Sequence, residues 1–558
     1  MAAEKYDVIV VGSGAGGGAA AWQLAERGLR VLLLEAGPAY DPLKDYLLDR
    51  NYWELGRFPE KISMRDRQTF APLQLLDPAG DDLRSWNRLH GRLVSGDRRV
   101  VWGHNHVMGL GGTTLRYTGE AHRMNPQAMQ MRTRFGVAAD WPLSYDDLEP
   151  DYQLAEKLIG VAGKNGDKLR WRSEPFPLPA HPLSYASQRL VDGAAKLQMR
   201  MVANSRAALS RPYDGRPPCN YCGQCNRGCP RLDKGSVDVT FLRQPAIARN
   251  CTIKTGCEVL RVRVRGNDRV SGVLYATPDG AQRFVAARAV VVAAGAIETP
   301  RLLLNSQDKT APDGLANESG EVGRNFLETL GWTSTAEHPD KLGSHRGLPA
   351  DAIIWDYNAP DAISDVIGGC RFVNSVLESD IAGPVNTAKR AVGGWGKSHK
   401  EAMRASFGHL LGVGSMGETL PHPDAFVALD PEAEDAHGLP RARIHTHLDD
   451  HAQKRLRFMA ETCRAILKAS GAEQLVEEYG AWDNFNSSHL FGTCRMGADP
   501  ETSVVDDKGR SHRWRNLFIT DASVFPSSGG GESPALTISA LAIRSARHIS
   551  ELAGRGEL

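Results

Sequence analysis

The sequence lacks an excess of charge of either sign. Its 67 Lys and Arg residues are balanced by 66 Asp and Glu residues, so the formal net charge at pH 7 is +1. Proteins that bind nucleic acid or an anionic membrane usually present a strong positive field to that partner. The balance therefore predicts no nucleic-acid partner, and we find no convincing local basic patch that would change this.

Long hydrophobic runs are also missing. The longest apolar run extends from Ala289 to Ile297, whereas a membrane-spanning helix needs about 20 apolar residues. The N-terminus, MAAEKYDVIVVG, has neither a basic segment nor a cleavable apolar stretch. The sequence predicts no membrane span and no export signal of its own.

The cysteines do not form a disulfide pattern. There are nine, an odd number, and five of them are scattered along the chain. The other four lie close together, at Cys219, Cys222, Cys225 and Cys229. This distribution indicates a protein of intracellular type with one special cysteine site.

A strand, a glycine turn, a helix and a second strand are expected at the N-terminus, in YDVIVV, GSGAGGGAAAWQLAERG and RVLLLEAG. Gly12, Gly14 and Gly17 form the pattern G-x-G-x-x-G. These glycines allow a tight turn, a close approach of phosphate to the backbone, and close packing of the helix on the strand. The helix N-terminus then faces a pyrophosphate, and Glu35 stands where an acid accepts a ribose hydroxyl. The unit predicts a Rossmann-type dinucleotide site.

Two later segments complete this predicted nucleotide-binding fold. From Cys257 onward, the pattern predicts a small antiparallel meander that returns to a buried strand in RFVAARAVVVAAG. Near the C-terminus, NLFITDASVFP predicts a buried strand that ends at Asp521. The segment SPALTISALAIRSARHISELA predicts a helix with Ser533 as N-cap and Pro534 at the first helical position. We therefore expect both chain ends in one domain.

Five motifs in order resemble the glucose–methanol–choline (GMC) oxidoreductase family. They are GSGAGG with LLLEAG, GLGGTTLRYTGEAHR at 109–123, GAIETPRLLLNS at 295–306, HLFGTCRMG at 489–497, and NLFITDASVFPSSGGGESPALTISALA. The resemblance implies an α/β protein with a split Rossmann-type FAD-binding domain and an α+β substrate domain that has an antiparallel sheet. We expect the FAD-binding domain at 1–45, 95–125, 210–330 and 482–558, and the substrate domain at 46–94, 126–209 and 331–481.

The resemblance also implies which residues hold FAD. Some family members attach FAD covalently through a histidine four residues after the second glycine of a pair; Arg116 occupies that position here, which predicts noncovalent FAD. The last helix is expected to direct its positive N-terminus at the flavin. The implied FAD-binding residues are Gly12, Gly14, Gly17 and Glu35 for the ADP half, Val259 for adenine, Gly111, Gly112 and Thr114 for the flavin, Asp521 and Ala522 for the pyrophosphate and ribityl chain, and Thr537 in the last helix.

Two catalytic residues are implied in the same way. His489 stands where the family keeps its base, and a neutral imidazole suits removal of a hydroxyl proton near neutral pH. The family usually places His or Asn before the Pro-x-x-Thr of the last helix, but this chain has Ser533. Ser533 either donates a hydrogen bond to the substrate oxygen or only caps the helix, and both interpretations stay open.

The cysteine segment CNYCGQCNRGCP has the C-x2-C-x2-C-x3-C-P spacing of a bacterial ferredoxin. It resembles bacterial FAD glucose dehydrogenase catalytic subunits, which implies an iron–sulfur cluster at Cys219, Cys225 and Cys229 and leaves Cys222 open. It also resembles the long-chain alcohol oxidase branch, which implies no cluster. A reduced cysteine-rich loop is the main alternative, and zinc is disfavoured because little chain separates the four ligands.

Taken together, the resemblance implies an FAD-dependent dehydrogenase of alcohols. The expected substrate is a sugar or glycoside hydroxyl, with hydride passing to flavin N5 and electrons to an external acceptor. The alternatives are an oxidase that uses O2 on a sugar or a hydrophobic alcohol, and a non-catalytic flavoprotein or electron-transfer subunit. The implied partners are a small signal-bearing subunit and a cytochrome c, so we expect the protein in the cytoplasm or, when exported with that subunit, in the periplasm.

Overall fold

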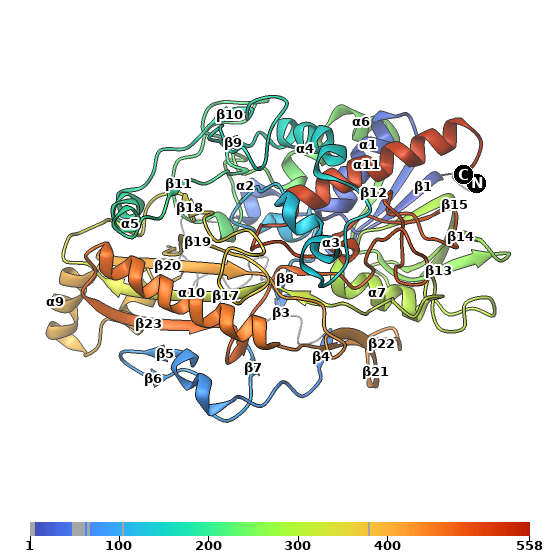
Figure 1. Ribbon diagram of the computed structural model, residues 1–558. Helices are drawn as coiled ribbons and strands as arrows, with labels where there is room; N and C mark the ends of the chain where they lie inside the picture. Colours follow the sequence, from blue (N-terminus) through green and yellow to red (C-terminus); the bar gives the residue numbers. More distant parts are fainter. Residues whose placement is uncertain (1–5, 47–61, 64–66, 103–104, 378–379) are drawn as a thin grey trace.

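Two large sheets organise the molecule, and they lie side by side in Figure 1. The computed structural model describes residues 6–46, 62–63, 67–102, 105–377 and 380–558. Both chain ends are marked at the same end of the molecule in Figure 1. This arrangement confirms the expected α/β fold class.

The first sheet joins segments from both ends of the chain, in the order β12-β2-β1-β15-β14-β13, with β26 beside β15. Strand β1 pairs in parallel with β2 and β15, and β15 pairs in parallel with β26. Strands β13, β14 and β15 form the predicted antiparallel meander. The strands are β1 (Tyr6–Val11), β2 (Val31–Leu34), β12 (Cys251–Lys254), β13 (Glu258–Arg265), β14 (Arg269–Ala276), β15 (Gln282–Val292) and β26 (Leu517–Ile519).

Helices cover this sheet, which explains why its central strands are apolar. The central strands β1 and β2 are buried and almost wholly apolar, as expected for parallel strands that are covered on both faces. Helix α1 starts at the glycine turn and packs along α11, drawn in red in Figure 1. The helices on this side are α1 (Ala15–Glu26), α4 (Tyr145–Ile159), α6 (Pro245–Asn250), α7 (Gly295–Asn305) and α11 (Ala535–Gly554).

The second sheet has the order β11-β18-β19-β20-β17-β23-β5-β6 and antiparallel pairing throughout. Helix α10 (Asp450–Ala469) lies across it and buries Leu456, Met459, Cys463 and Ile466, which share one helix face. The strands are β5 (Trp86–Asn87), β6 (Gly91–Arg92), β11 (Met201–Ala203), β17 (Leu330–Glu337), β18 (Ala352–Ile354), β19 (Cys370–Asn374), β20 (Leu410–Gly417) and β23 (Gln474–Gly480). Most of these strands lie in the segments expected for the substrate domain, and β17 begins at Leu330, in a segment expected for the FAD-binding domain. The domain boundaries stay a prediction.

Shorter elements complete the fold. The remaining strands are β3 (Ile62–Ser63), β4 (Gln68–Phe70), β7 (Val100–Val101), β8 (Asn105–His106), β9 (Ala162–Gly163), β10 (Leu178–Pro179), β16 (Leu327–Glu328), β21 (Phe426–Glu434), β22 (Pro440–His445), β24 (Asn484–Phe485) and β25 (Leu490–Phe491). The remaining α-helices are α2 (Pro42–Asp45), α3 (Met131–Phe135), α5 (Tyr185–Lys196), α8 (Pro384–Asn386) and α9 (Gly396–Ser406). Among the helices of the described residues, none has the length and apolar character that crossing a membrane requires.

The start of helix α11 differs from the prediction. The helix begins at Ala535 with Pro534 as its N-cap, and no side chain caps it. The hydroxyl of Ser533 instead donates to Glu120, and its backbone N–H donates to His122. The predicted capping role of Ser533 is therefore wrong, because partners from a distant segment hold this residue.

Candidate functional site

A cavity of about 480 Å³ collects most of the predicted site residues. Its wall includes the glycine turn before α1, the turn before α7, strand β25 and the segment before α11. The predicted residues on the wall are Gly12, Gly14, Glu35, Gly112, Thr114, Val259, His489, Asp521, Ala522 and Ser533. Gly17, Gly111 and Thr537 are predicted site residues that do not line it.

In the glycine turn, backbone atoms form the wall of the cavity. Gly12 has φ +88°, and a Cβ atom there would lie 2.6 Å from the carbonyl oxygen of Ala293. A Cβ atom on Gly17 would overlap the carbonyl of Gly12, so Gly17 serves the packing of α1. At Gly14 the nearest atom would be 4.0 Å away. The chain thus leaves an open space over Gly14, as close approach of a phosphate requires.

Glu35 follows β2 and lies buried on the cavity wall. Its carboxylate accepts hydrogen bonds from the Ser13 N–H (3.0 Å), the Ser13 hydroxyl (2.5 Å) and the Gly37 N–H (2.8 Å). Burial raises the pKa of Glu35, and these three hydrogen bonds oppose that shift. The side chain is therefore held beside the glycine turn, where an acidic group accepts a ribose hydroxyl.

Asp521 follows β26 and connects three elements at the cavity. Its carboxylate accepts hydrogen bonds from the Gly295 N–H (2.9 Å), the Thr299 hydroxyl (2.5 Å) and the Ser523 N–H (2.9 Å). Burial raises the pKa of Asp521, and the bonds to Ser523 and Thr299 counteract it. Asp521 therefore fixes the turn before α7, which itself lines the cavity.

His489 reaches the same cavity from the second half of the chain. It directly precedes β25, which pairs with β16, and the Thr329 N–H donates to the His489 carbonyl at 3.0 Å. The half-buried side chain lies on the wall together with the neighbouring Ser488. The structure thus brings the predicted base and the glycine turn to one cavity.

A buried ion pair, which the sequence analysis missed, stands behind Ser533. Glu120 lines the cavity, and its two carboxylate oxygens accept hydrogen bonds from Arg371 at 2.8 Å each. Burial raises the pKa of Glu120, but the opposing effect of Arg371 and His122 is larger. The net pKa therefore lies well below its usual range. Glu120 is part of the quoted motif at 109–123, but nothing local in the sequence indicates a partner 251 residues away.

His122 completes what we call the Glu120 cluster: Glu120, His122, Asn204, Arg371 and Ser533. The Ser533 N–H donates to His122 Nδ1 at 3.0 Å, so His122 Nε2 carries the proton and donates to Asn204 at 2.8 Å. Burial, together with Arg371, lowers the pKa of His122 to about 3. His122 is therefore neutral near pH 7.

The cysteine segment touches the cavity through Asn226, which lies between Cys225 and Cys229. Cys219 and Cys229 hydrogen-bond to the buried Asp233, and burial raises the pKa of Cys225 to about 12. These surroundings favour thiols over thiolates. They do not support the implied iron–sulfur cluster, which stays a prediction.

The spacing of these thiols also bears on the zinc alternative. Zinc holds its ligands at about 2.0–2.3 Å and thus close to one another. Among the described residues, the group with ligand atoms near enough for one ion is His422, Asp424 and His447, all within 4.8 Å, and it contains no cysteine. Zinc at the cysteine segment stays the disfavoured alternative that the sequence analysis gave.

Arg116 and His106 also line the cavity. Arg116 donates from Nε to the Asn226 carbonyl at 2.7 Å, which ties the cavity wall to the cysteine segment. Burial lowers the pKa of His106 to about 4. The sequence analysis missed His106, since a lone histidine ahead of the glycine pair gave no signal of its own.

Comparison with known families gives three matches along the chain. Residues 7–41 match the FAD binding domain family. Residues 109–330 and 421–542 match the GMC oxidoreductase family, in its N-terminal and C-terminal parts. These ranges contain the glycine turn, Glu120 and His489.

Curated relatives match nearly the whole chain. The fructose dehydrogenase large subunit of Gluconobacter japonicus is 28% identical over 97% of each chain. The 2-methyl-1,2-propanediol dehydrogenase of Mycolicibacterium austroafricanum is 30% identical over 98% of this chain and 96% of that protein. The paromamine 6'-oxidase of Streptomyces fradiae is 29% identical over 98% of this chain and 91% of that protein.

Solved structures share the fold at lower identity. Pyridoxine 4-oxidase from Mesorbium loti has a TM-score of 0.63 and 21% identity, covering 98% of this chain and 99% of that one. A formate oxidase variant from Aspergillus oryzae has a TM-score of 0.64 and 16% identity, covering 100% of both chains. At these identities the likeness shows the fold alone.

Proposed function

This chain belongs to the GMC oxidoreductases and is an FAD-dependent enzyme that acts on alcohol groups, and we propose that it is a dehydrogenase of a sugar or glycoside hydroxyl. The observation that carries the proposal is the position of His489 on the same cavity wall as Gly14, Glu35 and Asp521. The names of two relatives, a fructose dehydrogenase large subunit and a gluconate 2-dehydrogenase flavoprotein, favour sugar-derived substrates.

The described residues fit FAD. The wall at Gly12 and Gly14 is bare backbone, Glu35 offers a buried acceptor, and the N-terminus of α11 ends at the cavity with Pro534 and Ala535. The positive end of that helix suits a reduced, anionic flavin. When bound, FAD supplies the acceptor for the hydride. We propose noncovalent binding, because Arg116 stands where some family members have the linking histidine.

His489 is the proposed base. A neutral imidazole on the cavity wall takes the proton of the substrate hydroxyl while the carbon that bears this hydroxyl loses a hydride. The imidazole then holds that proton as imidazolium. General base catalysis by one side chain contributes about 10²- to 10⁴-fold.

The test is flavin reduction without oxygen. Purified yellow protein is mixed anaerobically with a panel of sugars and alcohols, and the loss of flavin absorption is followed in time. We expect His489→Ala to slow reduction by about 10²- to 10⁴-fold while the protein stays yellow. The matched control is His399→Ala, a half-buried histidine on α9 that does not line the cavity. Reduction of the His489→Ala protein at the wild-type rate would refute the assignment of the base.

An oxidase is the second candidate, because the paromamine 6'-oxidase is as similar to this chain as the dehydrogenases are. An oxidase forms peroxide from substrate and O2 alone, whereas a dehydrogenase turns over only with a dye or a cytochrome c. A flavin that no alcohol reduces would instead support the non-catalytic flavoprotein.

We further propose a small signal-bearing partner subunit and a cytochrome c acceptor. The relative named as a large subunit supports an assembly of several chains. Co-expression with candidate small subunits, followed by size-exclusion chromatography, tests this. A monomer that is fully active in the cytosol would contradict it, and an iron assay on the same sample decides the predicted cluster at Cys219, Cys225 and Cys229.

A further inference from the structure

Both hydrogen-bond donors of Ser533 are used inside the protein. Its backbone N–H donates to His122 Nδ1 at 3.0 Å, and its hydroxyl donates to Glu120 Oε2 at 3.1 Å. The next residue, Pro534, has no N–H to offer. This segment therefore presents no donor to the cavity at Ser533.

Glu120 determines the direction of the Ser533 hydroxyl. A carboxylate accepts about four hydrogen bonds, and Glu120 receives four. Oε1 accepts from Arg371 at 2.8 Å and from Asn204 at 2.8 Å, and Oε2 accepts from Arg371 at 2.8 Å and from Ser533 at 3.1 Å. Because an ionised carboxylate only accepts, the proton of this bond belongs to Ser533.

Ser533 retains one lone pair for a ligand. A hydroxyl has one donor and two acceptor positions. The donor goes to Glu120, and a longer contact of 3.4 Å from Arg371 Nη2 reaches the Ser533 oxygen. Because Ser533 lines the cavity, its remaining lone pair is available to a ligand there. A ligand group that meets it has to be a donor.

We propose that Ser533 is a specificity residue that only accepts hydrogen bonds, and that it selects substrates with a second O–H or N–H group beside the hydroxyl that reacts, such as vicinal diols. This inference rests on the proposed alcohol oxidation. Glu120 and Arg371 are positioning residues, because they act through Ser533.

The second donor has to be distinct from the reacting hydroxyl. As that hydroxyl gives its proton to His489, its oxygen gains negative charge, and such an oxygen is stabilised by donors. A lone pair of Ser533 facing it would repel it. A neighbouring hydroxyl keeps its proton throughout the reaction and satisfies Ser533 without this conflict, whereas a substrate without it leaves a buried acceptor unpaired.

Three small probes separate a donor from an acceptor. Propane-1,2-diol, 2-methoxypropan-1-ol and 2-methylpropan-1-ol share one primary hydroxyl and carry a hydroxyl, a methoxy or a methyl group beside it. The methoxy group accepts but does not donate. We expect kcat/KM for oxidation of the primary hydroxyl to be about 3- to 10-fold higher for the diol than for either other probe, the range of one neutral hydrogen bond.

Variants on helix α11 and just before it complete the test. We expect Ser533→Ala to reduce the preference for the diol to less than about twofold, in line with loss of one hydrogen bond. Ser539→Ala removes a buried hydroxyl that donates to the carbonyls of Ala15 and Ala535 and does not line the cavity, so it keeps the preference.

Equal rates for the diol and the methoxy probe, or a full preference in Ser533→Ala, would overturn the inference while leaving the proposed function intact. If no alcohol reduces the flavin, the proposed function fails. The affinities of the three probes, measured by their effect on the flavin spectrum, then still decide whether Ser533 selects a donor.

Discussion

The two sides of the cavity are built in opposite ways. On the side of Gly12 and Gly14 the wall is backbone, and its shape depends on the absence of side chains. On the side of Ser533 the wall includes the buried Ser533 and Glu120, and Arg371 pairs with Glu120 behind the wall. Both sides bring polar atoms to the same cavity.

The two sides also differ in how far apart in the sequence their residues lie. The glycine turn is formed by residues close together in sequence, so one short motif predicts it. The Glu120 cluster combines residues from 120 to 533, each of which needs the others to be tolerated when buried. Substitutions should therefore affect the two sides differently, and the following experiments test that contrast.

The largest effect on stability is expected from breaking the ion pair. Arg371→Met leaves Glu120 buried with only a longer contact of 4.0 Å to Arg206, and loss of one partner of a buried pair costs about 3–5 kcal/mol. Urea unfolding measures this as a lower midpoint. The double variant Glu120→Gln with Arg371→Met should recover part of the loss, since it removes both charges of this pair. A matched control is Arg515→Met, whose partner Asp268 is exposed. Equal midpoints for Arg371→Met and Arg515→Met would contradict the contrast.

A methyl group added in the glycine turn should lower either the stability of the fold or the affinity for FAD, depending on its position. Gly17→Ala overlaps the carbonyl of Gly12, and we expect it to destabilise the fold by about 1–3 kcal/mol or more, as overpacking does. Gly14→Ala has free space in the protein but faces the cavity. It should keep its unfolding midpoint and lose FAD affinity, measured by release of the flavin on dilution. Normal FAD affinity in Gly14→Ala would mean that phosphate does not approach there.

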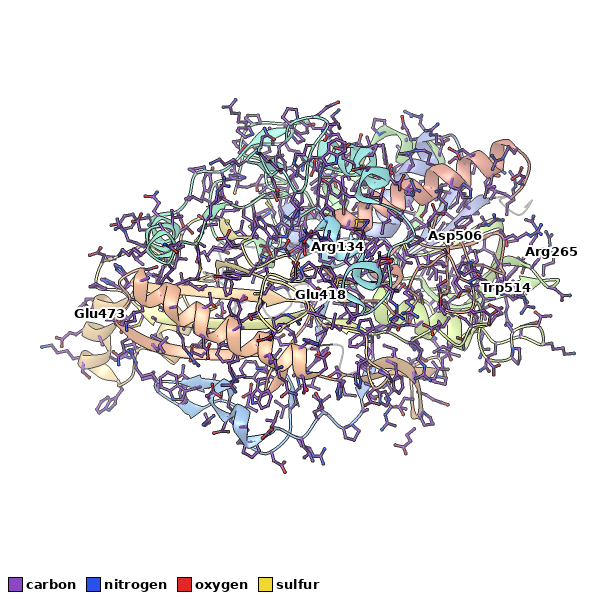
Figure 2. The ribbon with its side chains drawn as sticks, in the orientation of Figure 1. Arg134, Arg265, Glu418, Glu473, Asp506 and Trp514 are labelled. Carbon is purple, nitrogen blue, oxygen red and sulfur yellow. The ribbon has the colours of Figure 1, made fainter. Side chains whose placement is uncertain are left out.

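A buried carboxylate near the Ser533 segment should make stability depend on pH. Glu418, labelled near the middle of the molecule in Figure 2, is buried, and burial together with Glu532 raises its pKa to about 7, against the opposing effect of Arg455. The unfolded chain releases this proton near pH 4.3. Between these values the folded protein holds one proton more than the unfolded chain, so stability falls as pH rises through this window.

Glu418→Gln should remove that dependence. At each pH we compare the free energy of unfolding of the variant with that of the wild type. We expect this difference to favour the variant more at pH 8 than at pH 5, by on the order of 2 kcal/mol. The exposed Glu473→Gln, also labelled in Figure 2, is the control and should leave the pH profile unchanged. Urea unfolding at the two pH values is the measurement, and parallel profiles for wild type and Glu418→Gln would contradict the raised pKa.

The smallest effect is expected at Thr537. The sequence analysis placed this residue among those that hold FAD, but its hydroxyl pairs with Tyr152 at 2.8 Å, away from the cavity wall. Thr537→Val should therefore cost about 1 kcal/mol of stability for one lost hydrogen bond and leave FAD affinity unchanged. A lower FAD affinity in this variant would support Thr537 as an FAD-binding residue.

The particular residues show how far the sequence alone could reach. The strand, turn and helix at Tyr6–Glu26 were predicted correctly because periodicity and the glycine spacing are local signals. The start of α11 was not, because Ser533 satisfies the local rule for an N-cap and yet bonds to Glu120 and His122. A local preference worth about 1 kcal/mol does not decide such a case against buried partners.

By itself the sequence determined the nucleotide-binding unit, the FAD-dependent family and the residue type offered as the base, since each depends on short motifs with a direct physical role. Only the tertiary structure decided that Ser533 donates its hydroxyl proton to Glu120, that Glu120 is paired with Arg371, and that the hydroxyl of Thr537 pairs with Tyr152. The reason is that hydrogen-bond direction and buried charge depend on which distant groups meet, and no spacing along the chain encodes that meeting.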